Sequence, residues 1–175
     1  MCIPRFLSEI LGKYTPFQAI YHYGAPPKGV LAFSGLMFIG GFVVAGLDFR
    51  FGWSVMPPWV VITASVLFLL AYALYAEVMR ENAYLSRTIR VEAGQTVVDT
   101  GLYGIVRHPM YAATLLLFFM IPLVLGSWYA LIVFAFYPVI ITVRLLDEER
   151  LLTRQLPGYA EYKKKVKYRL IPFVW

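Results

Sequence analysis

Cysteine and charge are scarce in this 175-residue sequence. The single cysteine, Cys2, excludes an internal disulfide and is either a plain thiol or a lipidation site. Charged residues make up only 15% of the chain, well below the roughly 25% of an ordinary soluble domain. This scarcity excludes a disordered chain, a coiled coil and an acidic tail, and it argues against a water-soluble globule.

Several motifs of catalysis and ligand binding are also missing. The two histidines, His22 and His108, lie far apart in the chain and no cysteine cluster accompanies them, so we expect no metal site. The sequence has neither the GxSxG turn of an α/β hydrolase nor a GxxxxGK(S/T) phosphate loop. Its glycine-rich stretch follows no strand, and the small pair Gly41 and Ala45 favours close helix packing instead.

Apolar residues dominate what is present. Hydrophobic residues account for 60% of the chain and the mean hydropathy is +0.67. These values predict an integral membrane protein surrounded by membrane lipids. The net charge of +6 is explained by membrane topology, so we expect no nucleic-acid partner. The first residues lack a continuous apolar core and a small-residue cleavage site, so we expect no signal peptide.

Two apolar runs have the length of a single membrane span. Residues 30–47 carry no charge until Asp48, and residues 59–76 follow a pair of prolines and end before Glu77. Proline suits the first turn of a helix, where its missing amide hydrogen is not needed. Backbone groups in lipid must bond within their own segment, so both runs are predicted to be helices.

A third apolar block, residues 110–146, is too long for one span. Proline, glycine and serine lie near its middle, so we interpret it as a tight helical hairpin of 110–125 and 127–146. Pro138 is expected to kink the second arm. The predicted fold is all-α, a polytopic membrane protein with about four transmembrane helices, a cytoplasmic loop and a C-terminal tail.

The basic residues predict the orientation of these spans. With four spans, all but one of the 16 lysines and arginines lie on the same side, and the exception is Arg50. The positive-inside rule then places both termini and the loop 80–107 in the cytoplasm. Residues 1–28 have apolar residues at helical spacing and are predicted to form an interfacial amphipathic segment. Residues 29–175 are predicted to form the membrane domain.

Polar residues gather in two stretches, at 99–111 before the hairpin and at 144–150 after it. Because a hairpin returns the chain to the same face, we expect Arg107 and His108 to lie close to Glu148 and its neighbours. The simpler alternative is that these charges only mark the membrane boundary and pair along the helix, as the spacing of Arg144 and Glu148 allows. Glu148 and Glu149 point about 100° apart on a helix, so we expect at most one of them to face a pocket while the other pairs outward.

These stretches resemble a known family. The run Gly101-Leu-Tyr-Gly-Ile-Val-Arg-His-Pro-Met-Tyr111, followed by a helical hairpin and then Glu148-Glu149, is similar to the isoprenylcysteine carboxyl methyltransferase family. That family is grouped with the phospholipid N-methyltransferases. The family's C-terminal tail is also similar to two short segments of this sequence, Leu156-Pro-Gly-Tyr-Ala-Glu-Tyr162 and Arg169-Leu-Ile-Pro172. The sequence departs from the family pattern at Ala113, where glycine is common, and in residues 1–28, where many relatives have extra spans.

The resemblance implies methyl transfer from S-adenosylmethionine to a lipophilic acceptor that enters from the bilayer. It implies that Arg107 and Glu148 form the catalytic centre, with Arg107 holding an acceptor carboxylate through two hydrogen bonds. A carboxylate needs no general base, whereas an amine or thiol would make Glu148 or His108 the candidate base. The implied cofactor-binding residues are Val98, Gly101, Tyr103, His108, Pro109, Tyr111 and Glu149. The implied substrate residues are Arg144, Tyr159, Tyr162 and Arg169.

Several alternatives stay open at this point. Tyr159 and Tyr162 are equally consistent with plain packing, and Arg169 with a solvated basic tail. The acceptor could be a prenylated protein, a phospholipid, a small thiol or an isoprenoid acid. A membrane reductase of the sterol-reductase kind, using NADPH, shares part of this architecture. A non-enzymatic membrane protein would use Arg107 and Glu148 for folding only.

Overall fold

The computed structural model describes residues 28–82, 84, 91 and 94–175. This part of the chain is helical and contains no strand, which confirms the predicted all-α fold. In chain order the elements are α2 (Lys28–Phe51), α3 (Pro58–Glu81), the 3-10 helix η1 (Gly101–Gly104), α4 (Pro109–Val124), α5 (Trp128–Phe134), α6 (Tyr137–Gln155) and α7 (Tyr159–Lys165).

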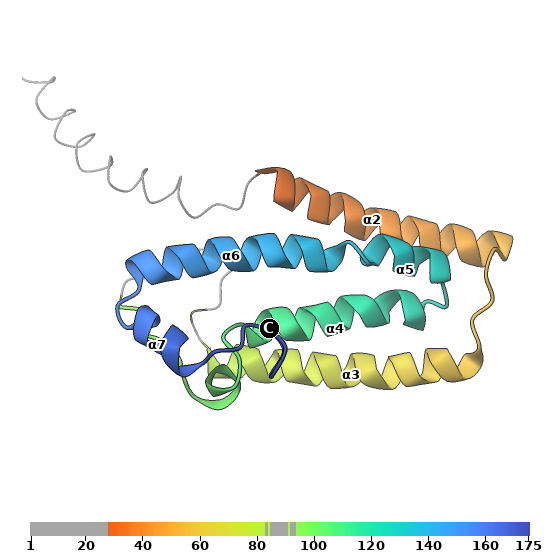
Figure 1. Cartoon of the computed structure of the whole chain (residues 1–175). Helices are drawn as coiled ribbons and strands as arrows, with labels where there is room; N and C mark the ends of the chain where they lie inside the picture. The colour runs from red at the N-terminus through yellow and green to blue at the C-terminus, as the bar shows by residue number, and fades with distance from the viewer. Residues whose placement is uncertain (1–27, 83, 85–90, 92–93) are drawn as a thin grey trace, which may run out of the picture.

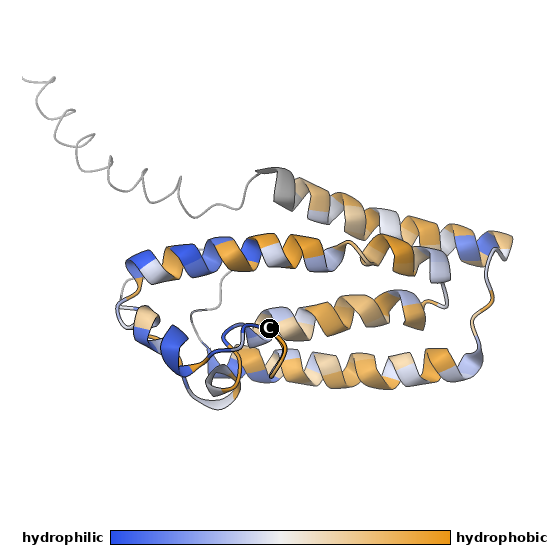
Figure 2. Cartoon of the chain, viewed as in Figure 1, coloured by the Kyte–Doolittle hydropathy of each residue, from blue (hydrophilic) through white to orange (hydrophobic). Residues whose placement is uncertain are grey.

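Three helical segments are long and apolar enough to cross a bilayer: Ala32–Phe51, Pro58–Glu81 and Trp128–Gln155. The last of these joins α5 and α6. The apolar helix α4 is shorter, and its 16 residues extend over about 24 Å. Figure 2 shows apolar residues along most of the length of these helices and hydrophilic residues at one end of the bundle. The chain is therefore a polytopic membrane protein.

The predicted hairpin is formed by α4 and the pair α5–α6. Its tip contains Gly126, whose φ of 73° is a conformation that favours glycine. Ser127 caps α5 by accepting a hydrogen bond from a backbone amide of the first turn. The second arm is broken between α5 and α6, directly before Pro138, because proline supplies no amide hydrogen to the helix. The predicted kink is confirmed.

The end predicted for the second arm, residue 146, is wrong. Helix α6 continues to Gln155 and includes the acidic residues of the second polar stretch. Ion pairs along the helix support this extension, since Arg150 Nη1 lies 3.1 Å from Asp147 Oδ1 one turn earlier. The acidic residues 147–149 therefore lie on α6, as the helical spacing assumed for Glu148 and Glu149 requires.

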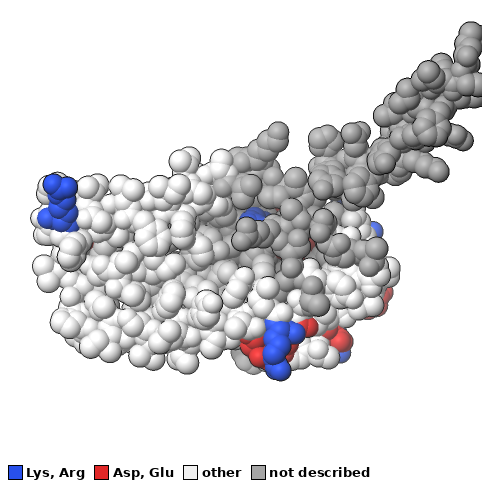
Figure 3. Space-filling model, turned by 180° about the vertical axis from the view of Figure 1, so that it is seen from behind, with Lys and Arg blue, Asp and Glu red and all other residues white. Residues whose placement is uncertain are grey.

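The helices are arranged so that four chain segments meet at one end of the bundle. Figure 1 shows the end of α3, the start of α4, the end of α6 and the short helix α7 together at this end, while α2 lies along α5 and α6. At the contact between α2 and α5, a Cβ on Gly41 would overlap the Phe134 ring, so any larger residue would require this buried ring to move. In Figure 3 most charged side chains lie in one half of the molecule, a basic side chain marks the opposite end, and a broad surface between them carries none in this view.

A buried carboxylate closes the opposite end of the bundle. Asp48, near the end of α2, is 1% exposed. Its Oδ1 accepts a hydrogen bond from the Ser54 amide at 2.7 Å, and its Oδ2 accepts one from the Ser54 hydroxyl at 2.7 Å and another from the Ser127 hydroxyl. These contacts tie the α2–α3 connection to the tip of the hairpin. We call this group the far-end cluster (Asp48, Ser54 and Ser127).

The predicted interfacial segment 1–28 lies outside the described residues, except for Lys28, the first residue of α2. The division of the chain at residue 28 stays a prediction.

Candidate functional site

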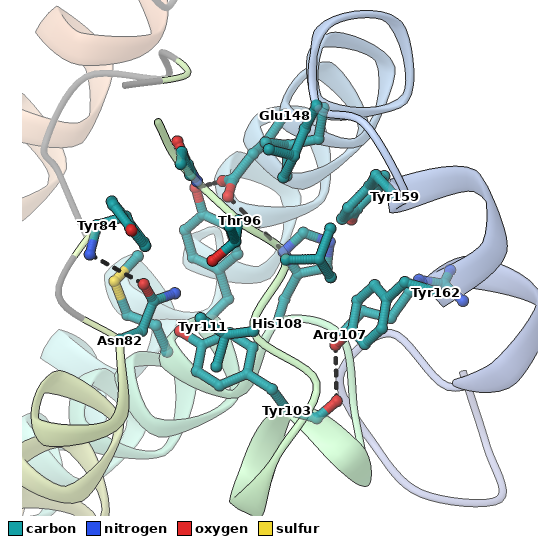
Figure 4. A pocket seen from close by; sticks show the side chains of 16 residues that line it. Asn82, Tyr84, Thr96, Tyr103, Arg107, His108, Tyr111, Glu148, Tyr159 and Tyr162 are labelled. Atoms are coloured by element: carbon teal, nitrogen blue, oxygen red, sulfur yellow. Dashed lines mark hydrogen bonds and ion pairs between the residues drawn. The ribbon is translucent and has the colours of Figure 1, made fainter. Parts of the chain in front are cut away.

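A pocket lies at the end of the bundle where α3, α4, α6 and α7 meet. Figure 4 shows side chains from α4, α6 and α7, from the loop before α4 and from the residues just after α3 around it. The lining residues are Asn82, Tyr84, Gln95, Thr96, Val97, Val98, Tyr103, Arg107, His108, Met110, Tyr111, Glu148, Leu152, Leu156, Tyr159 and Tyr162. The two polar stretches of the sequence thus meet at one site, as the hairpin requires.

The loop before α4 is fixed to the end of α3. The Leu102 amide donates a hydrogen bond of 3.0 Å to Glu81 Oε2. Gly101 has a φ of 51°, and a Cβ at this position would overlap the Glu81 carboxylate. A side chain at residue 101 is therefore excluded by both conformation and space. Gly101 lies outside the pocket lining, and the cofactor-binding role that the resemblance implies for it stays a prediction.

Arg107 and Glu149 form a buried ion pair at the base of the site. Arg107 Nε lies 2.7 Å from Glu149 Oε1, and each side chain is 5% exposed. Arg107 Nη1 also donates hydrogen bonds to the backbone carbonyls of Val166 at 2.8 Å and Lys167 at 2.9 Å. Two of the three guanidinium nitrogens are thus held by the protein itself, and Nη2 is the nitrogen that these contacts leave for a ligand.

Only Glu148 of the two glutamates lines the pocket, in agreement with the expected limit of one, but Glu149 is buried and does not pair outward. Glu149 is 4% exposed, and its second oxygen, Oε2, lies 3.1 Å from Arg169 Nε. Lys163 Nζ approaches the same oxygen at 3.9 Å. The reason is that the segment after α7 returns over this face of α6, so both glutamates point into protein. The sequence of α6 alone could not predict the burial of Glu149, because the segment that covers it comes from later in the chain.

Glu148 is the carboxylate that faces the pocket. Its Oε2 accepts a hydrogen bond of 2.6 Å from the Tyr111 hydroxyl, and its Oε1 lies 3.9 Å from His108 Nδ1. The side chain is 23% exposed, whereas that of His108 is 4% exposed. Glu148 is therefore held by one strong hydrogen bond and keeps Oε1 available for a ligand or a proton.

Buried polar atoms around the pocket lack partners. The hydroxyls of Tyr103 and Tyr159 are buried, and neither has a hydrogen-bond partner among the residues that the structure describes. Burial raises the pKa of Tyr103 to about 12 and also raises the pKa of Tyr159, so both phenols keep their proton at neutral pH. Unpaired buried groups of this kind are costly in a folded protein, and here they line one cavity.

The remaining sequence-predicted residues are divided between the pocket and its surroundings. The pocket is lined by Val98, Tyr103, Arg107, His108, Tyr111, Glu148, Tyr159 and Tyr162. Outside the lining lie Gly101, Pro109, Arg144, Glu149 and Arg169. Pro109 is the buried first residue of α4, and Arg144 lies one turn before Glu148 on α6.

Sequence reasoning missed a polar wall of the pocket formed by Asn82, Tyr84, Gln95 and Thr96, together with the apolar residues Val97, Met110, Leu152 and Leu156. Asn82 directly follows α3, and its Oδ1 accepts a hydrogen bond of 3.0 Å from the Tyr84 amide. A polar residue at the predicted end of the second span was the available signal for Asn82. The loop residues carried no comparable signal.

The fold and the site define a polytopic helical membrane protein with a polar pocket at one end of the bundle. The sequence model of the isoprenylcysteine carboxyl methyltransferase family matches residues 59–154, and the chain belongs to that family. The chain is also similar to the Delta(14)-sterol reductase of Mus musculus, with 31% identity over 91 residues. The match covers 50% of this chain and 22% of that reductase, so the chain spans about a fifth of its length.

Proposed function

We propose that the protein transfers a methyl group from S-adenosylmethionine to a lipophilic acceptor at the cytoplasmic face of the membrane. Membership of the family supports membrane methyltransferase activity. The observation that carries the proposal is that the buried hydroxyls of Tyr103 and Tyr159 have no hydrogen-bond partner in the described part of the chain and lie in one pocket with the carboxylate of Glu148. A ligand with several polar groups would satisfy them, and an apolar lipid chain alone would not.

The pocket residues fit the chemistry of the methyl donor. S-adenosylmethionine carries a sulfonium, an ammonium, a carboxylate and an adenine, and when bound it supplies an electrophilic methyl group. Glu148 would attract the cationic groups, and the protonated hydroxyls of Tyr103 and Tyr159 would donate to oxygen or nitrogen acceptors. The apolar side chains of Val97 and Leu156 would contact the adenine. The protein would contribute position and electrostatics, which is how methyl transfer is promoted without a covalent enzyme intermediate.

The acceptor side of the site constrains the role of Arg107. The sequence-based hypothesis has Arg107 hold an acceptor carboxylate through two hydrogen bonds, but Nε and Nη1 already bind Glu149 and backbone carbonyls. An acceptor carboxylate would therefore meet Nη2. An amine or thiol acceptor would need to lose a proton, and Glu148 Oε1 and His108 are the groups in the pocket that can accept it. Arg107 serves the site first as a fixed charge beside Glu149.

The membrane orientation is part of the proposal. Arg50 lies in the last turn of α2, at the end of the bundle opposite the pocket. The positive-inside rule then places the pocket on the cytoplasmic side, where the other basic residues gather. Labelling tests this in a Cys2→Ser background. A cysteine at the exposed Val55 should react with an external impermeant reagent, and one at the exposed Lys164 should not. The reverse pattern would contradict the orientation.

Titration of the purified protein with S-adenosylhomocysteine and with NADPH tests the proposed activity. We expect binding of S-adenosylhomocysteine, followed by radiolabelled methyl transfer to a component of a total lipid and protein extract. The extract assay also identifies the acceptor, because labelled lipid and labelled protein separate on extraction. Absence of S-adenosylhomocysteine binding would remove the proposal.

A second candidate, an NADPH-dependent reductase, is favoured by the partial similarity to the Delta(14)-sterol reductase. It predicts that NADPH binds and that S-adenosylhomocysteine does not. Binding of neither compound would leave a non-enzymatic membrane protein, in which Arg107 and Glu149 stabilise the fold only.

A further inference from the structure

The segment after α7, residues 166–171, crosses the loop that carries Arg107 and His108. The Arg107 amide donates a hydrogen bond of 2.9 Å to the Tyr168 carbonyl, and the His108 amide donates one of 2.9 Å to the Arg169 carbonyl. Two further carbonyls of the segment hold the Arg107 guanidinium, as described above. Both the backbone and the side chain of Arg107 are therefore positioned by one short piece of chain.

The side chain of Arg169 makes the same segment contact the second glutamate. Its Nε lies 3.1 Å from Glu149 Oε2, on the other side of the carboxylate from Arg107. The Arg169 guanidinium also lies over the ring of Trp175, 5.2 Å from the ring centroid. Glu149 is thus held between two guanidinium groups, and each of its oxygens has its own charged donor.

The segment is anchored in the core. Leu170 is 5% exposed and packs in the cluster that contains Tyr111 and Leu145. The backbone amides of Arg169, Leu170 and Ile171 all donate to the Trp175 carbonyl, at 2.9 to 3.1 Å. These contacts give Arg169 a fixed backbone position from which to reach Glu149.

We infer that residues 166–171 form a positioning strap for the candidate active site, and that Arg169 is a positioning residue acting through Glu149. With Arg169 in place, Glu149 presents Oε1 to Arg107 and lies 3.4 Å from His108 Nε2. Without it, Glu149 Oε2 loses its hydrogen-bonded cation and keeps only Lys163 Nζ, which at 3.9 Å is beyond hydrogen-bond distance, so the carboxylate would turn to share the donors that remain. Arg107 and His108 would then lose the geometry in which they line the pocket.

Two measurements test this inference. One of them, ligand binding, rests on the proposed function, and the other, the local structure around Arg107, does not. The structural readout is hydrogen–deuterium exchange of the full-length protein in detergent, followed at the amides of Arg107 and His108. The binding readout is the affinity for S-adenosylhomocysteine. Arg169→Gln removes the charge, Arg169→Lys keeps it, and Lys164→Gln removes an exposed charge nearby as a matched control.

We expect Arg169→Gln to speed exchange at Arg107 and His108 and to weaken S-adenosylhomocysteine binding on the order of tenfold. Arg169→Lys should restore a large part of both values, and Lys164→Gln should match the wild type. Exchange and affinity unchanged in Arg169→Gln would overturn the inference, and so would equal losses in Arg169→Gln and Lys164→Gln.

Two further results are also decisive. If the wild type does not bind S-adenosylhomocysteine, the proposed function fails, and unchanged exchange in Arg169→Gln would then overturn the strap by itself. If Arg169→Gln gives no folded protein, Arg169→Lys takes its place. The lysine ammonium reaches less far than the arginine guanidinium, so Arg169→Lys should hold Glu149 less well. Faster exchange at the Arg107 and His108 amides in Arg169→Lys than in the wild type would support the strap, and identical exchange would overturn it.

Discussion

The two ends of the helical bundle each bury a carboxylate, but they treat it differently. In the far-end cluster the oxygens of Asp48 accept hydrogen bonds from the Ser54 amide, the Ser54 hydroxyl and the Ser127 hydroxyl. At the pocket end the buried Glu149 is equally well held by Arg107 and Arg169. Around it, however, the hydroxyls of Tyr103 and Tyr159 lack partners among the described residues.

This difference separates a structural polar cluster from a ligand site. A buried hydroxyl without a partner costs about 1–3 kcal/mol, so a cluster that only stabilises the fold should satisfy its members. The far-end cluster does so, and it closes the loop between α2 and α3 against the hairpin tip. At the pocket end, the hydroxyls of Tyr103 and Tyr159 have no partner among the residues that the structure describes, which is the pattern expected where a ligand binds. The comparison predicts opposite outcomes for matched substitutions at the two ends.

The largest effect is expected from Glu148→Gln. The substitution keeps the shape of the side chain and removes the negative charge that faces the pocket, so methyl transfer should fall by about 10²–10³-fold. The midpoint of thermal unfolding should stay close to that of the wild type, because Glu148 is partly exposed and the amide oxygen can still accept the Tyr111 hydrogen bond. Radiolabelled transfer and thermal unfolding in detergent measure the two quantities. Turnover near the wild-type rate would remove Glu148 from the site.

The opposite pattern is expected from Asp48→Asn. The amide nitrogen would face donors that now bind a carboxylate oxygen, so the midpoint of unfolding should fall by about 5 °C. Methyl transfer per folded molecule should be unchanged, because Asp48 lies at the other end of the bundle. Ser54→Ala, which removes one donor to Asp48, should give a smaller fall. Loss of transfer without loss of stability would contradict the structural role of the far-end cluster.

The two ends of the bundle also differ in how much of their structure could be predicted from the sequence. Proline and glycine predicted the hairpin and its kink because they act through their own backbone. A hairpin of two membrane spans returns the chain to the same face of the membrane. This alone predicted that Arg107 and the two glutamates lie close together. The orientation of Glu149 was out of reach, because the strap that covers α6 comes from residues after 165.

Residues of the polar wall escaped prediction for a related reason. Thr96 lies in a loop whose course depends on long-range contacts, such as the hydrogen bond between the Leu102 amide and Glu81. Such contacts join residues that have no regular spacing, so periodicity does not reveal them. The contact between Gly101 and Glu81 is of the same kind, since a Cβ at residue 101 would overlap a side chain that lies 20 residues earlier in the chain.

The tyrosines of α7 allow a sharper test within the pocket end. The Tyr162 hydroxyl donates a hydrogen bond of 2.7 Å to the Tyr103 carbonyl, whereas the Tyr159 hydroxyl has no partner in the described part of the chain. Tyr162→Phe should therefore cost about 1 kcal/mol of unfolding free energy, and Tyr159→Phe should cost none. Tyr159→Phe should instead weaken S-adenosylhomocysteine binding a few-fold. Equal destabilisation by Tyr159→Phe and Tyr162→Phe would mean that the Tyr159 hydroxyl already has a hydrogen-bond partner in the protein. The contrast between the far-end cluster and the pocket would then be lost.

The smallest effect is expected from the exposed ion pair at the pocket end, where Lys165 Nζ lies 2.7 Å from Asp99 Oδ2. The hydrogen bond from Lys165 lowers the pKa of Asp99 below its usual 3.8, so the pair stabilises the fold above that pH and loses its effect as the pH falls through the lowered pKa. Lys165→Gln should lower the unfolding midpoint only slightly at neutral pH, and less in high salt, because solvent and ions screen an exposed pair. Below the lowered pKa of Asp99, the variant and the wild type should have the same unfolding midpoint. A large loss at neutral pH would mean that α7 is held to the pocket loop by charge, and that buried groups such as Tyr162 contribute less than their geometry indicates.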